Sequence, residues 1–96
     1  MTLAQLLGDK RQDILRLATQ HGARNVRVFG SLARGEARPD SEVDILIALD
    51  PERSPLDLVA LKQDLEDLLS CKVDVVTEAA VSPYIRPQVL RDAVAL

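Results

Sequence analysis

The chain has 96 residues, of which 47% are hydrophobic, and its 12 Lys and Arg against 15 Asp and Glu give a formal net charge of −3. This length predicts one domain spanning residues 1–96, because a second core would need roughly another 50 residues. The acidic balance, with Phe29 and Tyr84 as the only aromatic residues, argues against direct nucleic-acid binding. The chain has no apolar run of roughly 20 residues and no signal-peptide features at its start, so we expect a cytoplasmic protein without a membrane span.

The N-terminal part of the chain predicts two helices, which could be fused. Leucine and isoleucine spacing indicates a short helical turn at residues 3–7 and a longer helix at residues 10–20. Thr2 and Asp9, each followed three residues later by glutamine, are typical of helix caps. Gly22 is expected to end the second helix.

The next part of the chain predicts two strands joined by turns. Residues 25–30 form the first expected strand, and residues 31–36 are expected to form one or two helical turns. Residues 37–41 include Pro39 and predict a turn. Residues 42–49 give the strongest strand pattern, with apolar side chains alternating along the chain.

The C-terminal half continues the alternation of helices and strands. Ser54-Pro55 is typical of a helix start, and leucine spacing predicts a helix that runs to about Leu69. A third strand is expected at residues 72–77, a last helix opening at Ser82-Pro83 with Val89 and Leu90 packed inward, and a small edge strand at residues 93–96. The order predicts an α+β fold, in which a mixed sheet of three to four strands carries helices mainly on one face.

His21 and Cys71 are candidate reactive residues with simpler explanations. His21 falls at a helix end, where a cap is the simpler role than catalysis. Cys71 is the single cysteine and has leucine and valine neighbours, so we interpret it as a core-filling thiol.

A possible phosphate site lies where the first strand ends. Gly30 has no Cβ and would let a ligand approach the backbone, while Ser31 offers a hydroxyl donor. If a helix begins directly after these residues, its free N–H groups would favour an anion. A Gly-Ser pair taken alone is typical of an ordinary turn.

Three acidic residues are the candidate metal ligands. Glu42 and Asp44 are two positions apart on the second strand, so they share a face at a spacing of about 6.5–7 Å. Asp74 is a charged residue within an apolar strand and would join them if the second and third strands are neighbours. Carboxylates so placed can bind a hard divalent cation, although each has a simpler explanation alone, as a solvated strand face or an arginine partner. Together with the Gly-Ser turn they favour metal-assisted nucleotidyl transfer.

The segment Phe29-Gly-Ser-Leu-Ala-Arg-Gly-Glu36, followed by Arg38-Pro-Asp-Ser41, resembles the minimal nucleotidyltransferases (MNT proteins) of the polymerase-β-type superfamily. The resemblance covers nearly the whole chain. It implies a mixed sheet and Mg²⁺-dependent use of a nucleoside triphosphate such as ATP, with Mn²⁺ as an alternative metal. It also implies that Gly30 and Ser31 bind the triphosphate.

By the same resemblance, Glu42, Asp44 and Asp74 are the catalytic, metal-binding carboxylates. The family has aspartate where this chain has Glu42, and the extra methylene moves the carboxylate by about 1.5 Å. Full activity is therefore in question, whereas the fold is not. Arg34 is a candidate nucleotide contact, and an ion pair with Glu36 or Asp40 is the equal alternative.

The resemblance also implies an acceptor on another chain. About 50 residues follow Asp44, and we expect the third strand and its helices to use them, which leaves no acceptor-binding domain in this sequence. MNT proteins are commonly paired with small helical HEPN toxins, and the resemblance implies AMP transfer from ATP to a tyrosine of such a toxin, as an antitoxin activity. The alternative is a weakly active or inactive module that neutralises its partner by binding. Transfer to a small molecule is less favoured, and the oligomeric state, including a homo-oligomer, is left open.

Overall fold

The computed structural model describes residues 3–36, 38 and 40–96. The elements are α1 (Leu3–Asp9), α2 (Arg11–Gln20), β1 (Ala23–Phe29), β2 (Val43–Leu49), α3 (Pro55–Leu69), β3 (Val73–Thr77), the 3₁₀ turn η1 (Glu78–Ala80), α4 (Arg86–Asp92) and β4 (Val94–Ala95). The cap predicted at Thr2 and the turn predicted around Pro39 involve residues outside this part of the chain. Within residues 3–36, 38 and 40–96, no helix is both long and apolar enough to cross a bilayer.

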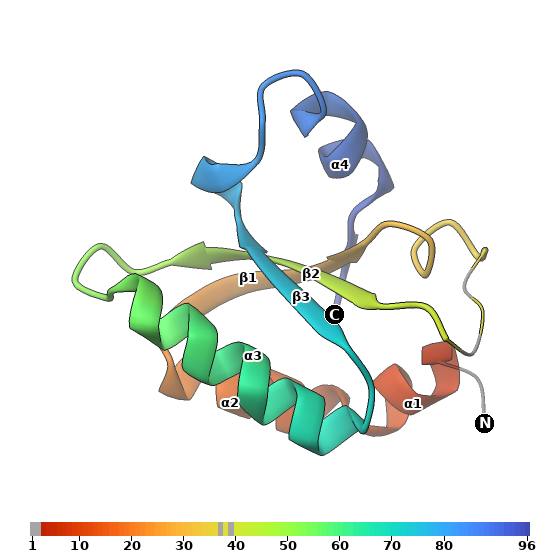
Figure 1. Cartoon of the computed structure of the whole chain (residues 1–96), viewed down its shortest axis with the longest axis horizontal. Coiled ribbons are helices and arrows are strands. Elements are labelled where there is room, and N and C mark those ends of the chain that lie inside the picture. Colours follow the sequence, from red (N-terminus) through yellow and green to blue (C-terminus); the bar gives the residue numbers. More distant parts are fainter. Residues whose placement is uncertain (1–2, 37, 39) are drawn as a thin grey trace.

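The four strands form one mixed sheet in the order β3-β2-β1-β4. β1 runs antiparallel to both β2 and β4, whereas β2 and β3 are parallel and are joined through α3. Helices α1, α2 and α3 lie on one face of the sheet, and α4 lies over the other (Figure 1). The predicted α+β class and the mixed sheet covered mainly on one face are confirmed.

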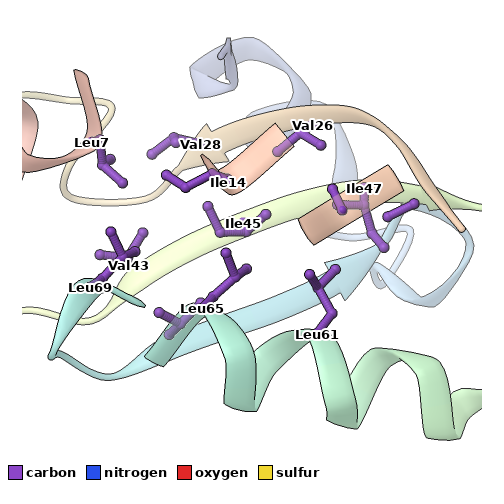
Figure 2. Close-up of a cluster of buried hydrophobic side chains, with 13 residues drawn as sticks. Leu7, Ile14, Val26, Val28, Val43, Ile45, Ile47, Leu61, Leu65 and Leu69 are labelled. Carbon is purple, nitrogen blue, oxygen red and sulfur yellow. The ribbon is translucent and has the colours of Figure 1, made fainter. Parts of the chain in front are cut away.

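The main core lies between the sheet and the helices of that more covered face. Val43, Ile45 and Ile47 alternate along β2 and are at most 1% exposed, on the side that α3 covers (Figure 2). Leu61 and Leu65 of α3 are equally buried and pack in the same cluster. The period-2 spacing of apolar residues in β2 and the near-period-4 spacing in α3 produce this contact. The packing of β2 against α3 therefore follows directly from the sequence.

Helix ends agree with the sequence in two cases and differ in one. At the start of α3, the Ser54 side chain accepts a hydrogen bond from the Leu56 N–H, and Asp57 accepts one from the Ser54 N–H, a complete capping box. Gly22 follows α2 with a positive φ of 74°, as expected for a helix stop. The cap predicted at Asp9 was wrong, because Asp9 ends α1.

The last helix begins later than the sequence predicted. α4 starts at Arg86, after a turn in which the Arg86 N–H donates to the Ser82 carbonyl oxygen. A helix opening at Ser82 would place Pro87 in its interior, where the ring clashes with the carbonyl group four residues earlier. Val89 is buried as predicted, but Leu90 is 46% exposed, so its inward placement was wrong.

Glu66 joins the end of α3 to the start of β3, and its charge should stabilise the fold. Its Oε2 accepts hydrogen bonds from the Val73 N–H and from Lys62 Nζ, each at 3.1 Å, and these contacts, Val73 first, lower the pKa of Glu66. Because the folded pKa is below the unfolded one, the stabilisation is present above the unfolded pKa and is lost as the pH falls through the folded pKa. We expect Glu66→Gln to lower the free energy of unfolding at neutral pH and to match the wild type in acid.

Urea denaturation at neutral pH and at a pH below the lowered, folded-state pKa of Glu66 measures this difference. Asp67→Asn, an exposed neighbour on the same helix, is the control and should change stability little at either pH. An equal loss for Glu66→Gln at both pH values would contradict the charge-dependent contact.

Candidate active site

Asp44 and Asp74 lie directly beside each other on parallel strands. The register pairs Asp44 of β2 with Asp74 of β3. Their neighbours Val43 and Val73 point into the core and are buried, so both carboxylates lie on the opposite face, the one over which α4 lies. The condition on which Asp74 was expected to join the other two acids, that the second and third strands are neighbours, is therefore met.

Glu42 completes what we call the acidic cluster, Glu42, Asp44 and Asp74. It immediately precedes β2 and is exposed, two positions before Asp44. Burial, followed by the negative charges of Asp74 and then Glu42, raises the pKa of Asp44 above its ordinary value. The charges of Asp74 and Glu42 therefore act on Asp44, which is the least exposed of the three.

The donor chemistry of this cluster suits a divalent cation. Ionised carboxylates are the oxygen ligands that Mg²⁺ uses in proteins, and a bound cation would relieve the repulsion felt by Asp44. Among the described residues, however, no three His, Cys, Asp or Glu side chains are already gathered as a ligand set. Because the three carboxylates do not form such a set, the exposed side chains of Glu42 and Asp74 would have to turn toward Asp44 to share an ion.

Gly30 contacts the acidic cluster, which the sequence did not reveal. Gly30 follows β1 with φ 75°, and a Cβ placed there would lie 2.2 Å from Asp44 Oδ2. The sequence argument gave Gly30 a role in ligand approach to the backbone. The structure adds a different reason for glycine, because the missing side chain makes room for the Asp44 carboxylate.

The segment after Gly30 is a series of turns and not the expected helical segment. The Arg34 N–H donates to the Gly30 carbonyl oxygen at 3.2 Å, and the Glu36 N–H donates to the Ser31 carbonyl oxygen at 2.8 Å. Hydrogen bonds of different spans within one short segment do not continue into a regular helix. The predicted helix N-terminus after Ser31 was therefore wrong, and any phosphate site here would be formed by turn backbone and the half-buried Ser31.

Arg34 makes the ion pair that the sequence left as one of two alternatives. Its Nε lies 3.1 Å from Glu36 Oε2, and its Nη1 lies 3.4 Å from Asp92 Oδ2 of α4. Its positive charge also lowers the pKa of Asp44, against the larger effects that raise it. The guanidinium is thus paired and close enough to the acidic cluster to act on it electrostatically.

No sequence motif identified several of the residues that surround the site. Gln88 and Asp92 of α4 line a cavity of about 200 Å³ together with Gly30 and Arg34. On the other side of the cluster, Lys62 and Lys72 line an open depression of about 450 Å³ together with Glu42 and Asp74. Only the tertiary fold brings these side chains to the motif, so local sequence patterns could not identify them.

His21 and Cys71 take the simpler roles expected of them. His21 is the C-cap residue of α2, and its Nε2 lies 2.7 Å from Asp64 Oδ2. Cys71 is half-buried and packs against the main core, and burial raises the pKa of its thiol. A raised pKa disfavours the reactive thiolate.

Known proteins resemble this chain in both sequence and structure. A protein adenylyltransferase, MntA of Thermococcus cleftensis, is 41% identical over 78 residues, which cover 81% of this chain and 79% of that protein. A solved structure provisionally described as a minimal nucleotidyltransferase has a TM-score of 0.89 and 49% identity, and the match covers 100% of this chain and 97% of the other.

More distant structures share the fold. Chains of toxin–antitoxin complexes match with TM-scores of 0.68–0.75 at 19–22% identity, covering 88–90% of this chain and 67–69% of theirs. At the level of families, residues 11–96 match the nucleotidyltransferase domain, which is most of the chain. The chain therefore belongs to the nucleotidyltransferase domain family, is a transferase of that family, and has the MntA protein adenylyltransferases among its relatives.

Proposed function

We propose that this protein transfers AMP from ATP, with Mg²⁺, to a hydroxyl group of a partner protein, a tyrosine of a HEPN-type toxin. The observation that carries the proposal is the pairing of Asp44 with Asp74 beside Gly30, which places carboxylates next to the Gly-Ser turn. A relative named as a protein adenylyltransferase supports the reaction. One distant fold neighbour is an MNT antitoxin in complex with a tri-AMPylated HEPN toxin, and another is a toxin–antitoxin complex with AMP-PNP, which supports the acceptor and the nucleotide.

Each part of the site has a role in this reaction. Gly30 and Ser31 would hold the triphosphate, and Glu42, Asp44 and Asp74 would hold the metal ion. Mg²⁺ at this position would neutralise charge on the reacting phosphate. The acceptor oxygen forms a bond to the α-phosphorus while the bond to the β-phosphate oxygen breaks, so pyrophosphate leaves. The hydroxyl proton passes to a carboxylate of the acidic cluster.

Arg34 would assist by contacting phosphate. Its present partners, Glu36 and Asp92, are 65% and 20% exposed at their side chains, so the Glu36 pair is open to solvent and screened. A triphosphate, which carries more charge than one carboxylate, can compete for a guanidinium held in this way.

The proposal is tested by mass spectrometry of a co-expressed partner. The natural candidate is a small helical protein with an Arg-x₄-His motif from the adjacent reading frame. We expect the partner to gain the mass of one or more AMP groups on a tyrosine when it is expressed with this protein. A partner that binds the protein and stays unlabelled in the presence of ATP and Mg²⁺ would favour the alternative, neutralisation by binding alone. The cytoplasmic location expected from the sequence stays a prediction.

Glu42 determines how active the site can be, and two variants, Glu42→Asp and Glu42→Gln, separate a weakened enzyme from one adapted to glutamate. If the extra methylene displaces the carboxylate by about 1 Å, the present rate is lowered near 10²-fold, and Glu42→Asp should recover it. If the backbone has adapted to glutamate, Glu42→Asp should lower the rate. Glu42→Gln should be inactive in both cases, since it removes the charge needed for metal binding.

AMP incorporation into the partner, measured with Mg²⁺ and with Mn²⁺, gives the answer. Partial recovery of the wild-type rate by Mn²⁺ would indicate a displaced ligand. Glu52→Asp, an exposed glutamate of the loop between β2 and α3, is the matched control and should leave the rate unchanged. Full activity of Glu42→Gln would show that Glu42 is not a ligand.

A further inference from the structure

An open depression adjoins the proposed phosphate site on the face of the sheet over which α4 lies. It measures about 200 Å³, and its lining includes Gly30 and Arg34 from the turn and Gln88 and Asp92 from α4. Phe29, Ile85 and Val89 contribute apolar surface to it. We call this space the base cavity. Gly30 belongs both to this lining and to the Gly-Ser turn, so the depression adjoins the place where a ligand would bind at the turn.

The size of the base cavity fits a single ring system better than a whole nucleotide. Sites for drug-sized ligands occupy about 300–1,000 Å³ and are mainly apolar with a few placed polar groups. The base cavity is smaller than that range and has the same kind of lining. The apolar side chains can pack against the faces of a planar base, while the sugar and phosphates remain at the turn.

Two polar side chains of α4 are placed to distinguish one base from another. Gln88 and Asp92 are four residues apart and therefore lie on the same face of the helix. An ionised carboxylate only accepts hydrogen bonds, whereas a glutamine amide both donates and accepts. Adenine presents an amino donor beside a ring-nitrogen acceptor, which matches this pair. Guanine presents a carbonyl oxygen at the same place, and that oxygen would face the carboxylate of Asp92.

Asp92 keeps capacity for this contact while it is paired with Arg34. Only Oδ2 lies near Arg34 Nη1, at 3.4 Å, and a carboxylate can accept at both of its oxygens. The side chain of Asp92 is 20% exposed and lines the depression, so its carboxylate is accessible to a bound ligand. The ion pair also links α4 to the turn across the depression.

We propose that the base cavity binds the adenine ring of the nucleotide, and that Asp92 and Gln88 select adenine over guanine. The proposal rests on the proposed function, because the nucleotide must first be held at Gly30 and Ser31. It adds the base-recognition residues, which lie outside the Gly-Ser motif and the acidic cluster.

The test is the ratio of affinities for MgATP and MgGTP, measured by calorimetry on the full chain. We expect the wild type to prefer ATP by about tenfold or more, since one hydrogen bond to a charged group is gained and one repulsion avoided. Asp92→Asn should bring the ratio close to one, because an amide can donate to the guanine oxygen. Gln88→Leu should weaken ATP binding and leave the binding of Mg-tripolyphosphate, which has no base, unchanged.

Asp92→Asn also releases Arg34 from its ion pair, and the ratio of ATP to GTP affinity separates this effect from base recognition. Releasing Arg34 changes the affinity for both nucleotides together, through their shared phosphates, whereas base recognition changes one against the other. Gln63→Leu and Asp67→Asn are the matched controls, because they are exposed residues of the same types and spacing on α3. They should leave the ratio as it is in the wild type.

Two outcomes overturn the proposal in different ways. Wild-type protein that binds MgATP and MgGTP equally, while still labelling its partner, would refute base selection and leave the proposed function intact. Wild-type protein that binds neither nucleotide nor tripolyphosphate would refute both. An ATP preference that survives Asp92→Asn and Gln88→Leu together would place adenine recognition elsewhere.

Discussion

Gly30→Ala should both destabilise the protein and slow AMP transfer about a hundredfold. The new Cβ would lie 2.2 Å from Asp44 Oδ2, so the carboxylate at the centre of the acidic cluster would have to move. The residue would also keep a φ of 75°, which costs a side-chain-bearing residue about 1–3 kcal/mol. Displacing a proposed metal ligand by about 1 Å is expected to lower the rate near 10²-fold.

Gly35→Ala is the matched control for this substitution. Gly35 has nearly the same φ, 73°, but a Cβ there meets nothing within 4 Å. Both variants therefore carry the backbone strain, and only Gly30→Ala carries the contact with Asp44. The difference between their free energies of unfolding, measured in urea, and between their AMP-transfer rates isolates that contact.

The double variant Gly30→Ala, Asp44→Ala shows whether contact with the Asp44 carboxylate causes the extra loss of stability in Gly30→Ala. The position of a Cβ at Gly30 is 3.5 Å from Asp44 Cβ, an ordinary contact distance. Gly30→Ala should therefore destabilise an Asp44→Ala background by the strain alone, about as much as Gly35→Ala does. An equal loss of stability and rate for Gly30→Ala and Gly35→Ala in the wild-type background would refute a specific role for the Gly30–Asp44 contact.

Periodic elements of this fold follow from the sequence because their burial is one-sided. β2 alternates between core and opposite face, and α3 has both a capping box and a leucine stripe. These local signals agree with the tertiary structure, so the strand, the helix and the mixed sheet were all predicted correctly. The neighbouring position of Asp74 was predicted only conditionally, since strand order depends on how α3 crosses the sheet.

Elements without a periodic apolar face were predicted less well. The 31–36 segment has turn hydrogen bonds of several spans, and nothing in its composition distinguishes this from a short helix. The predicted start of α4, at Ser82, was too early. The prediction gave the Ser-Pro pair, a common helix start, more weight than the exclusion of Pro87 from a helix interior. The base cavity could not be predicted, because it joins the turn to a helix distant in sequence.

Asp44→Asn should abolish AMP transfer and, at the same time, stabilise the protein without metal. The pKa of Asp44 is raised by burial, then by Asp74 and Glu42, so its ionised form is disfavoured in the folded state. The folded pKa of Asp44 is therefore above its unfolded pKa. The contribution of Asp44 to the free energy of unfolding is most favourable below the unfolded pKa, and it is lost as the pH rises through the folded pKa. The neutral amide avoids this loss. In EDTA, Asp44→Asn should therefore be more stable than the wild type at neutral pH and similar to it in acid.

Adding Mg²⁺ with nucleotide should reverse the order of stability. A ligand that binds only the folded state stabilises it by about 2.7 kcal/mol at a hundred times its dissociation constant, and the variant lacks the central carboxylate for this binding. Thermal unfolding in EDTA and in Mg²⁺ with a non-hydrolysable ATP analogue should thus give curves that cross for Asp44→Asn. Asp67→Asn, exposed on α3, should follow the wild type in both conditions. Equal stabilisation of the wild type and Asp44→Asn by the metal and nucleotide, with AMP transfer retained, would remove Asp44 from the site. A crossing accompanied by loss of transfer would identify one carboxylate as both the destabilising charge of the empty site and the ligand that the reaction requires.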